Sequence, residues 1–209
     1  MFAEFVGTFA LVFLGAGAIV SGKADLLGVA LAHGLAIAIA VSAFAGISGA
    51  HFNPAVSAVM LATKRIGLQE FVYFVLAQLA GAAVASLLIN YVFGHGNGYG
   101  LPVIAIGTSI GQAVVAEAIG TALLLFTIFG VAVDSRGTFK SVAGLPIGLM
   151  ITAVILSVGP ITGAALNPAR WFGPALISGD WNHAWVYIFA PTLGALIAGF
   201  AYQLIAKPE

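Results

Sequence analysis

The sequence predicts an all-α membrane protein with six transmembrane helices and two re-entrant half-helices, arranged as an inverted repeat. Charged residues make up 7% of the 209 residues and hydrophobic residues 61%, whereas a soluble domain usually carries about 25% charged residues. Long stretches without charge are separated by short polar segments, and three blocks of sequence occur twice in the same order. This composition excludes a cytosolic enzyme and a disordered chain.

The net charge and the absence of cysteine exclude further classes of protein function. The formal net charge is zero, so the chain has no basic surface for phosphate and no nucleic-acid partner is expected. It contains no cysteine, which excludes disulfides, thiol chemistry and iron–sulfur clusters. No cofactor and no bound metal are expected from the sequence.

Six segments are long enough to cross a bilayer, which takes about 20 apolar residues. The Gly- and Asn-rich residues 94–100 divide the longest charge-free stretch and predict a loop. The expected crossings are residues 1–21, 26–46, 69–93, 111–133, 141–159 and 183–206.

Two apolar pieces, at about 47–63 and 160–179, have half the length of a crossing. Each contains Asn-Pro-Ala, and these residues are Asn53, Pro54 and Ala55 in the first piece and Asn167, Pro168 and Ala169 in the second. Asn is a good N-cap and Pro suits the first helical position, so both motifs predict helix starts. One alternative is an interfacial helix. The other is a re-entrant half-helix, which is tolerated at membrane depth where it lines a cavity or is buried in protein.

An internal repeat favours the re-entrant alternative. The repeated blocks are residues 3–8 and 116–121, residues 47–55 and 161–169, and the small residues Ala77, Gly81, Ala85 and Ala190, Gly194, Ala198. Each half has an odd number of crossings, so the second half must insert upside down relative to the first. We therefore expect one transmembrane domain over residues 1–209, with inverted repeats at about 1–95 and 111–206 and a functional site between them near the bilayer midplane.

The basic residues predict the orientation. Most of them fall on one predicted side of the membrane: Lys64, Arg65, Arg136, Lys140 and Lys207. Lys23 falls on the other side, and Arg170 falls within the membrane region. By the positive-inside rule both termini are expected in the cytoplasm. The chain has no long termini, which favours a prokaryotic plasma-membrane protein, so a multi-pass location in the cell membrane is expected.

The two half-helix starts predict a particular chemistry at the midplane. Each helix N-terminus carries roughly half a positive charge, and two that meet would disfavour a cation. The side-chain oxygens of Asn53 and Asn167 can cap the helices while their amide groups donate to a passing molecule. Such a site favours neutral polar solutes over ions and protons.

The two motifs with their flanks resemble the signature loops of the aquaporin (major intrinsic protein) family. They read His51-Phe52-Asn53-Pro54-Ala55-Val56 and Leu166-Asn167-Pro168-Ala169-Arg170, and the resemblance extends over nearly the whole chain. It implies a channel for passive passage of water, with ammonia or other small neutral solutes as further candidates, that excludes ions and protons. It also implies a homotetramer in the lipid bilayer, with one pore in each subunit.

The resemblance assigns roles to further residues. Glu4 and Glu117, as buried carboxylates, would by default suggest a proton or ion relay, whereas in the family such carboxylates hold the re-entrant loops. The family's selectivity filter corresponds here to His33, Ile155, Ala164 and Arg170. Its ladder of pore carbonyls corresponds to Gly49, Ala50, His51, Gly163, Ala164 and Ala165.

The filter residues resemble those of the plant vacuolar-membrane branch, whose members pass ammonia or urea besides water. Trp171 stands where glycerol-conducting members usually have Asp, which predicts poor glycerol passage. His33 titrates near neutrality in water, so its charge is expected to tune the flux. His95 and His183 are expected in loops outside the membrane.

Two alternatives from other classes stay open at this point. Gly46-Ile47-Ser48-Gly49 matches a short serine-nucleophile pattern, for which His33 or His51 could act as base. A coupled secondary transporter of a small neutral solute is the other alternative, although the sequence shows no paired carboxylates for a coupling ion.

Overall fold

The computed structural model describes residues 1–94, 96–137 and 140–206, and in these ranges it is helical and contains no strand. Two of the residues discussed above, His95 and Lys207, lie outside the described ranges. The long helices are α1 (Phe2–Val20), α2 (Leu26–Ser48), α4 (Leu68–Phe93), α5 (Ile110–Ile128), α6 (Gly144–Thr162) and α8 (Ala184–Ile205). All six, with α5 extended by the π-helical turn Phe129–Val133, are long and apolar enough to cross a membrane. The short helices are α3 (Pro54–Ala62) and α7 (Pro168–Ser178).

Local sequence signals explain several helix ends. The Asp25 side chain caps α2 by accepting from the Gly28 N–H, and Ser109 forms a capping box with Gln112 at the start of α5. Helices α2 and α6 end where Gly49 and Gly163 adopt φ of 79°, a left-handed conformation that glycine takes without steric cost.

Several predicted helix boundaries were displaced. Helix α6 begins at Gly144 rather than at residue 141, because Lys140–Val142 form a separate 3-10 turn. Helices α2 and α6 also continue to Ser48 and Thr162, past the predicted 46 and 159, since no left-handed residue interrupts them earlier.

The two halves show the same order of elements and the same packing. Helix α1 packs against α4 and α2, α5 packs against α8 and α6, and α2 packs against α6 between the halves. Small residues allow the closest approaches: Gly81 of α4 lies against the Phe5 backbone, and Gly194 of α8 lies against the Ala118 backbone. Both belong to the repeated small residues, whose spacing lets membrane helices pack closely.

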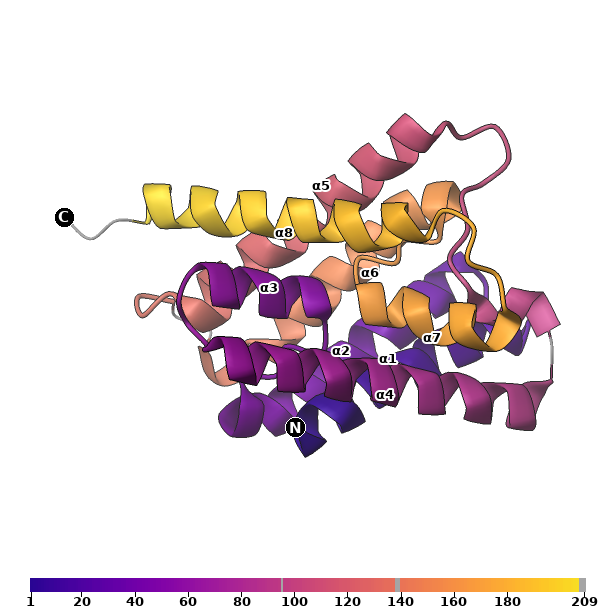
Figure 1. Cartoon of the computed structure of the whole chain (residues 1–209), viewed down its shortest axis with the longest axis horizontal. Coiled ribbons are helices and arrows are strands. Elements are labelled where there is room, and N and C mark those ends of the chain that lie inside the picture. The colour runs from indigo at the N-terminus through magenta and orange to yellow at the C-terminus, as the bar shows by residue number, and fades with distance from the viewer. Residues whose placement is uncertain (95, 138–139, 207–209) are drawn as a thin grey trace.

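The half-helices α3 and α7 lie in the interior of this bundle. Figure 1 shows them end to end between α8 and α4, with the long helices running alongside. Their starting residues are directly linked, because the Asn53 side chain contacts Leu166 and the Asn167 side chain contacts Phe52. Two segments far apart in sequence therefore meet at the centre of the molecule.

Candidate functional site

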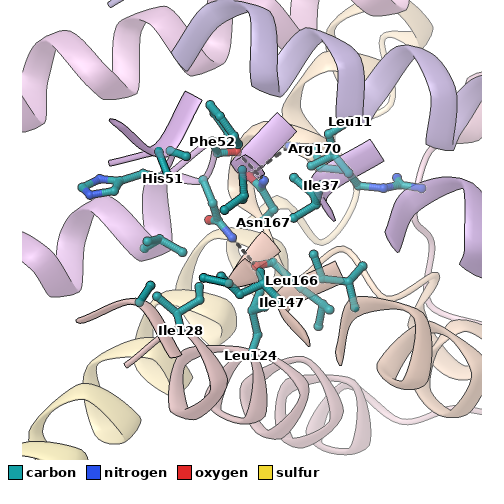
Figure 2. Close-up of a pocket in the computed structure, with 18 of the residues that line it drawn as sticks. Leu11, Ile37, His51, Phe52, Leu124, Ile128, Ile147, Leu166, Asn167 and Arg170 are labelled. Carbon is teal, nitrogen blue, oxygen red and sulfur yellow. Dashed lines mark hydrogen bonds between the residues drawn. The ribbon is translucent and has the colours of Figure 1, made fainter. Parts of the chain in front are cut away.

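A cavity of about 290 Å³ runs through the region where α3 and α7 begin. It is lined by residues of both re-entrant loops, by His33, Ile155 and Arg170, and by Lys140 of the turn that precedes α6. Figure 2 shows Asn167 in the middle, with Leu11 and Ile37 on one side and Leu124, Ile128 and Ile147 on the other. The wall is thus apolar for most of its length, with polar groups contributed mainly by the two loops.

Asn53 and Asn167 each cap their own half-helix and also bind the opposite loop. The Asn53 oxygen accepts from the Ala55 N–H at 2.9 Å, and the Asn167 oxygen accepts from the Ala169 N–H at 2.9 Å. Their amide nitrogens donate across the repeat, from Asn53 to the Leu166 carbonyl at 2.9 Å and from Asn167 to the Phe52 carbonyl at 2.8 Å. An amide nitrogen carries two hydrogens, so one donor on each Asn remains for a molecule in the cavity.

The residues that precede each Asn adopt paired left-handed conformations. Ala50 and Phe52 have φ of 53° and 50°, and Ala164 and Leu166 have φ of 46° and 55°. In non-glycine residues these conformations are uncommon and cost energy. A glycine lies under each loop, because a Cβ at Gly7 would overlap the Phe52 ring and a Cβ at Gly120 would lie 2.8 Å from Leu166 Cδ2.

Most residues of the predicted carbonyl ladder line this cavity. The lining includes Gly49, Ala50, His51, Ala164 and Ala165. Gly163 lines a neighbouring recess instead, together with Asp25, Asn97 and Ile155.

Glu4 is fully buried and accepts hydrogen bonds from the first loop and from α4. The donors are the Ser48 hydroxyl at 2.6 Å, the His51 N–H at 3.0 Å, the Phe52 N–H at 2.7 Å and the Gln78 amide at 2.7 Å. Gln78 also donates to the Ser57 hydroxyl, which contacts His51 Nδ1 at 3.1 Å. Neither Gln78 nor Ser57 was predicted from the sequence as a site residue. A polar residue on the buried face of an apolar helix was the signal available for Gln78.

Glu117 occupies the equivalent position in the second half. It accepts from the Thr162 hydroxyl at 2.6 Å, the Ala165 N–H at 2.9 Å and the Leu166 N–H at 2.8 Å. Ser48 and Thr162 are also repeat equivalents, and each also accepts a backbone N–H of its loop. Both carboxylates therefore satisfy loop donors that would otherwise be unpaired inside the membrane.

Arg170 and His33 contact each other at one end of the cavity. The guanidinium donates to the Gly100 carbonyl at 2.9 Å, and its other terminal nitrogen lies 3.3 Å from His33 Nε2. His33 Nδ1 lies 2.8 Å from the Val29 carbonyl, which can only accept, so Nδ1 carries the hydrogen. Nε2 is then the acceptor for Arg170, and the imidazole is neutral.

Ile155 and Ala164 are the apolar members of the predicted filter. Both side chains are buried and both lie on the cavity. His33, Ile155, Ala164 and Arg170 therefore all line the same cavity, and His33 and Arg170 are in direct contact.

A turn of unusual handedness supplies the acceptor for Arg170. Residues Asn97, Gly98 and Tyr99 all have left-handed φ and ψ, and Gly100 has φ of 69°. Asn97 donates to the Ile19 carbonyl at 2.8 Å, which ties the turn to the end of α1. This loop was expected from its Gly and Asn content, but its contact with Arg170 was not.

The serine-nucleophile pattern does not assemble a catalytic pair among the described residues. The Ser48 hydroxyl donates to Glu4, His33 contacts Arg170, and His51 Nδ1 contacts Ser57. Ser48 therefore stabilises the first re-entrant loop through hydrogen bonds to Glu4 and from the Ala50 N–H.

Comparisons with known proteins agree with this architecture. The profile of the family described as Major intrinsic protein matches residues 1–202. A glycerol uptake facilitator protein-like 6 from Lactiplantibacillus plantarum is 40% identical, and the match covers 99% of this chain and 98% of that protein. Aquaporin AqpM from Methanothermobacter marburgensis is 38% identical, covering 98% and 96%.

A plant relative and a solved structure complete the comparison. Aquaporin TIP4-4 from Zea mays is 40% identical, covering 96% of this chain and 84% of that protein. The X-ray structure of the aquaglyceroporin from Plasmodium falciparum superposes with a TM-score of 0.88 at 28% identity, covering 96% and 93%. The family match over nearly the whole chain and the cavity between two half-helices lead to one conclusion: this chain belongs to the major intrinsic protein (aquaporin) family and is a transmembrane channel for water and small neutral solutes.

Proposed function

We propose that this channel passes water in single file past Asn53 and Asn167 and rejects ions and protons there. The observation that carries the proposal is the pair of cross-repeat bonds, Asn53 to Leu166 and Asn167 to Phe52. These bonds fix both amide groups at the start of a helix, where the helix dipoles add positive potential. A water molecule can accept from the remaining amide hydrogens, whereas a cation meets two positive helix ends.

His33, Ile155, Ala164 and Arg170 form the selectivity filter in this proposal. Arg170 supplies fixed positive charge and donors, which supports rejection of cations. Ile155 and Ala164 offer no hydrogen bond, so the filter favours a small neutral solute such as ammonia besides water. We expect glycerol to pass poorly, because Trp171 stands where glycerol-conducting members of the family usually have Asp. One relative is named as a glycerol uptake facilitator, so glycerol flux should be measured beside water flux.

The assembly and location follow from family resemblance and charge. Homotetramers with one pore per subunit are typical of the family, and many apolar side chains on the outside of the bundle, such as Leu35, Ile39 and Val115, are exposed in the single chain. The basic residues Lys64, Arg65, Arg136 and Lys140 support a cell-membrane orientation with both termini in the cytoplasm.

Osmotic water flux into proteoliposomes tests the role of the Asn pair. Asn167→Val removes the cap and the cross-repeat donor, and we expect the water permeability of inserted, folded protein to fall several-fold. Asn182→Val, which changes an exposed Asn on the loop before α8, is the matched control and should conduct as the wild type does. Unchanged flux in folded Asn167→Val protein would contradict the proposal.

Solute gradients test the filter. We expect wild-type vesicles to admit ammonia, and the double variant His33→Phe, Ile155→His to lose ammonia flux relative to water flux. If the double variant keeps both rates, these residues do not form the filter. Solute uptake that depends on a sodium or proton gradient would identify a coupled transporter instead.

A further inference from the structure

We propose that Gly15 of α1 is a positioning residue that sets the aperture of the filter by fixing where the His33 ring lies. This inference rests on the proposed role of His33 in the filter. Gly15 does not line the cavity, whereas His33 does. Gly15 therefore acts on the passage through its contact with the His33 ring.

The contact between Gly15 and the imidazole leaves no room for a side chain. A Cβ at Gly15 would lie 2.5 Å from His33 Nε2 and 2.6 Å from His33 Cγ, well inside van der Waals contact. Gly15 lies in the middle of α1 with ordinary helical geometry, so its backbone does not require glycine. Glycine is required at this position because any side chain would overlap the His33 ring.

The ring has few alternative positions. It is 3% exposed, Nδ1 is held by the Val29 carbonyl at 2.8 Å, and Nε2 lies 3.3 Å from the Arg170 guanidinium. With α1 behind it, a ring pushed away from Gly15 moves toward the cavity and disturbs its contact with Arg170. A methyl group at position 15 thus changes both the width of the passage and the polar pair that lines it.

Arg170 on the far side of this contact is also positioned through α1. A Cβ at Gly100 would lie 2.8 Å from Ala16 Cβ, so the turn that carries the Gly100 carbonyl packs closely on the residue after Gly15. Consecutive residues of α1 thus support the His33 ring and the carbonyl that holds Arg170. Of this helix, Leu11 alone is among the described residues that line the cavity.

The experiment compares three variants in proteoliposomes, with water and ammonia as the permeants. Gly15→Ala should lower water permeability by about threefold or more, because aperture controls conduction, and should change the ratio of ammonia to water flux. Gly17→Ala is the matched control: a Cβ there would meet Phe93 at 3.6 Å, an ordinary contact, so its flux should equal the wild type's. Thermal unfolding of each variant checks that the protein is folded.

The double variant Gly15→Ala, His33→Ala separates positioning from general packing. Removal of the imidazole makes room for the methyl group, so the double variant should conduct as His33→Ala alone does and should fold even where Gly15→Ala does not. If Gly15→Ala lowers flux equally with and without His33, or leaves flux and the solute ratio unchanged, the inference is overturned. If His33→Ala itself leaves both fluxes unchanged, it is the proposed filter that fails.

Discussion

Glu4 and Glu117 hold equivalent loops with different sets of donors. Glu4 binds the Gln78 amide in addition to a hydroxyl and two backbone N–H groups, whereas Glu117 binds the hydroxyl and the two N–H groups alone among the described contacts. The second loop therefore depends more heavily on each remaining bond of its carboxylate.

The variant Glu117→Gln should still conduct water but unfold at a lower temperature than the wild type. A glutamine amide would face the Ala165 or Leu166 N–H, and a buried donor left unpaired costs about 1–3 kcal/mol. Thermal unfolding in detergent measures the effect, and Glu70→Gln, at an exposed carboxylate of α4, is the control that should leave stability unchanged. Normal stability combined with a steep change in the pH dependence of flux would indicate a proton relay instead.

Water flux should be independent of pH between about 5.5 and 8, although histidine in water titrates near 6.5. Protonation of His33 would place a hydrogen on Nε2, directly opposite the Arg170 guanidinium at 3.3 Å, and two like charges at that distance repel. The expectation that the charge on His33 tunes the flux is therefore replaced by a fixed neutral ring. Stopped-flow measurements across this range test it, and a flux midpoint near 6.5 that disappears in His33→Phe would contradict it.

At the scale of elements, the small residues of the repeat determine how closely helices approach. Gly194 of α8 lies against the Ala118 backbone of α5, and a methyl group there would overlap backbone atoms that have no side-chain freedom. Gly46, in contrast, lies on an exposed part of α2 with nothing within 4 Å of an added Cβ.

Gly194→Ala should therefore destabilise the protein, whereas Gly46→Ala should be neutral or stabilising. Overpacking in a well-packed interior typically costs about 1–3 kcal/mol, while replacing an unconstrained helical glycine gains about 0.5–1 kcal/mol. Melting temperatures of the two variants, measured side by side in the same detergent, should shift in opposite directions or differ clearly. Equal melting temperatures would show that the α5–α8 contact tolerates an added methyl group.

Hydrophobic length and the repeat were sufficient to predict all six long helices and both half-helices. Caps at Asn53 and Asn167 followed from residue type, because capping is a local interaction. The conformation of the loop at residues 96–100 could not be predicted from its sequence. Nothing in these residues indicates that the Gly100 carbonyl accepts a hydrogen bond from Arg170, seventy residues later. The choice of partner depends on tertiary packing, so a single sequence cannot supply it.

At the scale of the whole molecule, Asp134 and Arg136 join two segments that are distant in sequence. Among the described residues a single ion pair forms, between Asp134 and Arg136 at 2.7 Å. Tyr202 of α8 donates to the same carboxylate, and Arg136 donates to the Ala206 carbonyl. These contacts join the segment after α5 to the end of α8.

Asp134→Asn should lower thermal stability at pH 7, and the difference from the wild type should shrink as the pH falls below about 4. Hydrogen bonds from the Arg136 side chain hold the pKa of Asp134 below its ordinary value. A lowered folded-state pKa contributes stability above the unfolded value of about 3.9 and loses it as the carboxylate is protonated. Melting curves from pH 7 to 3 provide the measurement, and a difference that stays constant over this range would show that the charge of Asp134 is not responsible.

The sequence predicted which residues line the cavity better than it predicted the contacts that hold them in place. His33, Ile155, Ala164 and Arg170 all line the cavity, and their role as a filter stays a prediction. The supporting residues Gly15, Gly100 and Gln78 were not selected, since each acts through packing or a single bond that links distant segments.

The cross-repeat bonds also constrain how the chain is made. The carbonyl that accepts the Asn53 amide belongs to a residue 113 positions later, and at synthesis rates of about 5–20 residues per second this separation takes roughly 6–23 s. During that interval the newly made first half holds an amide donor and the Phe52 carbonyl without their native partners. Water or neighbouring protein must satisfy these groups until the second re-entrant loop emerges from the ribosome. The first half therefore cannot complete its native hydrogen bonds before the second half has been synthesised.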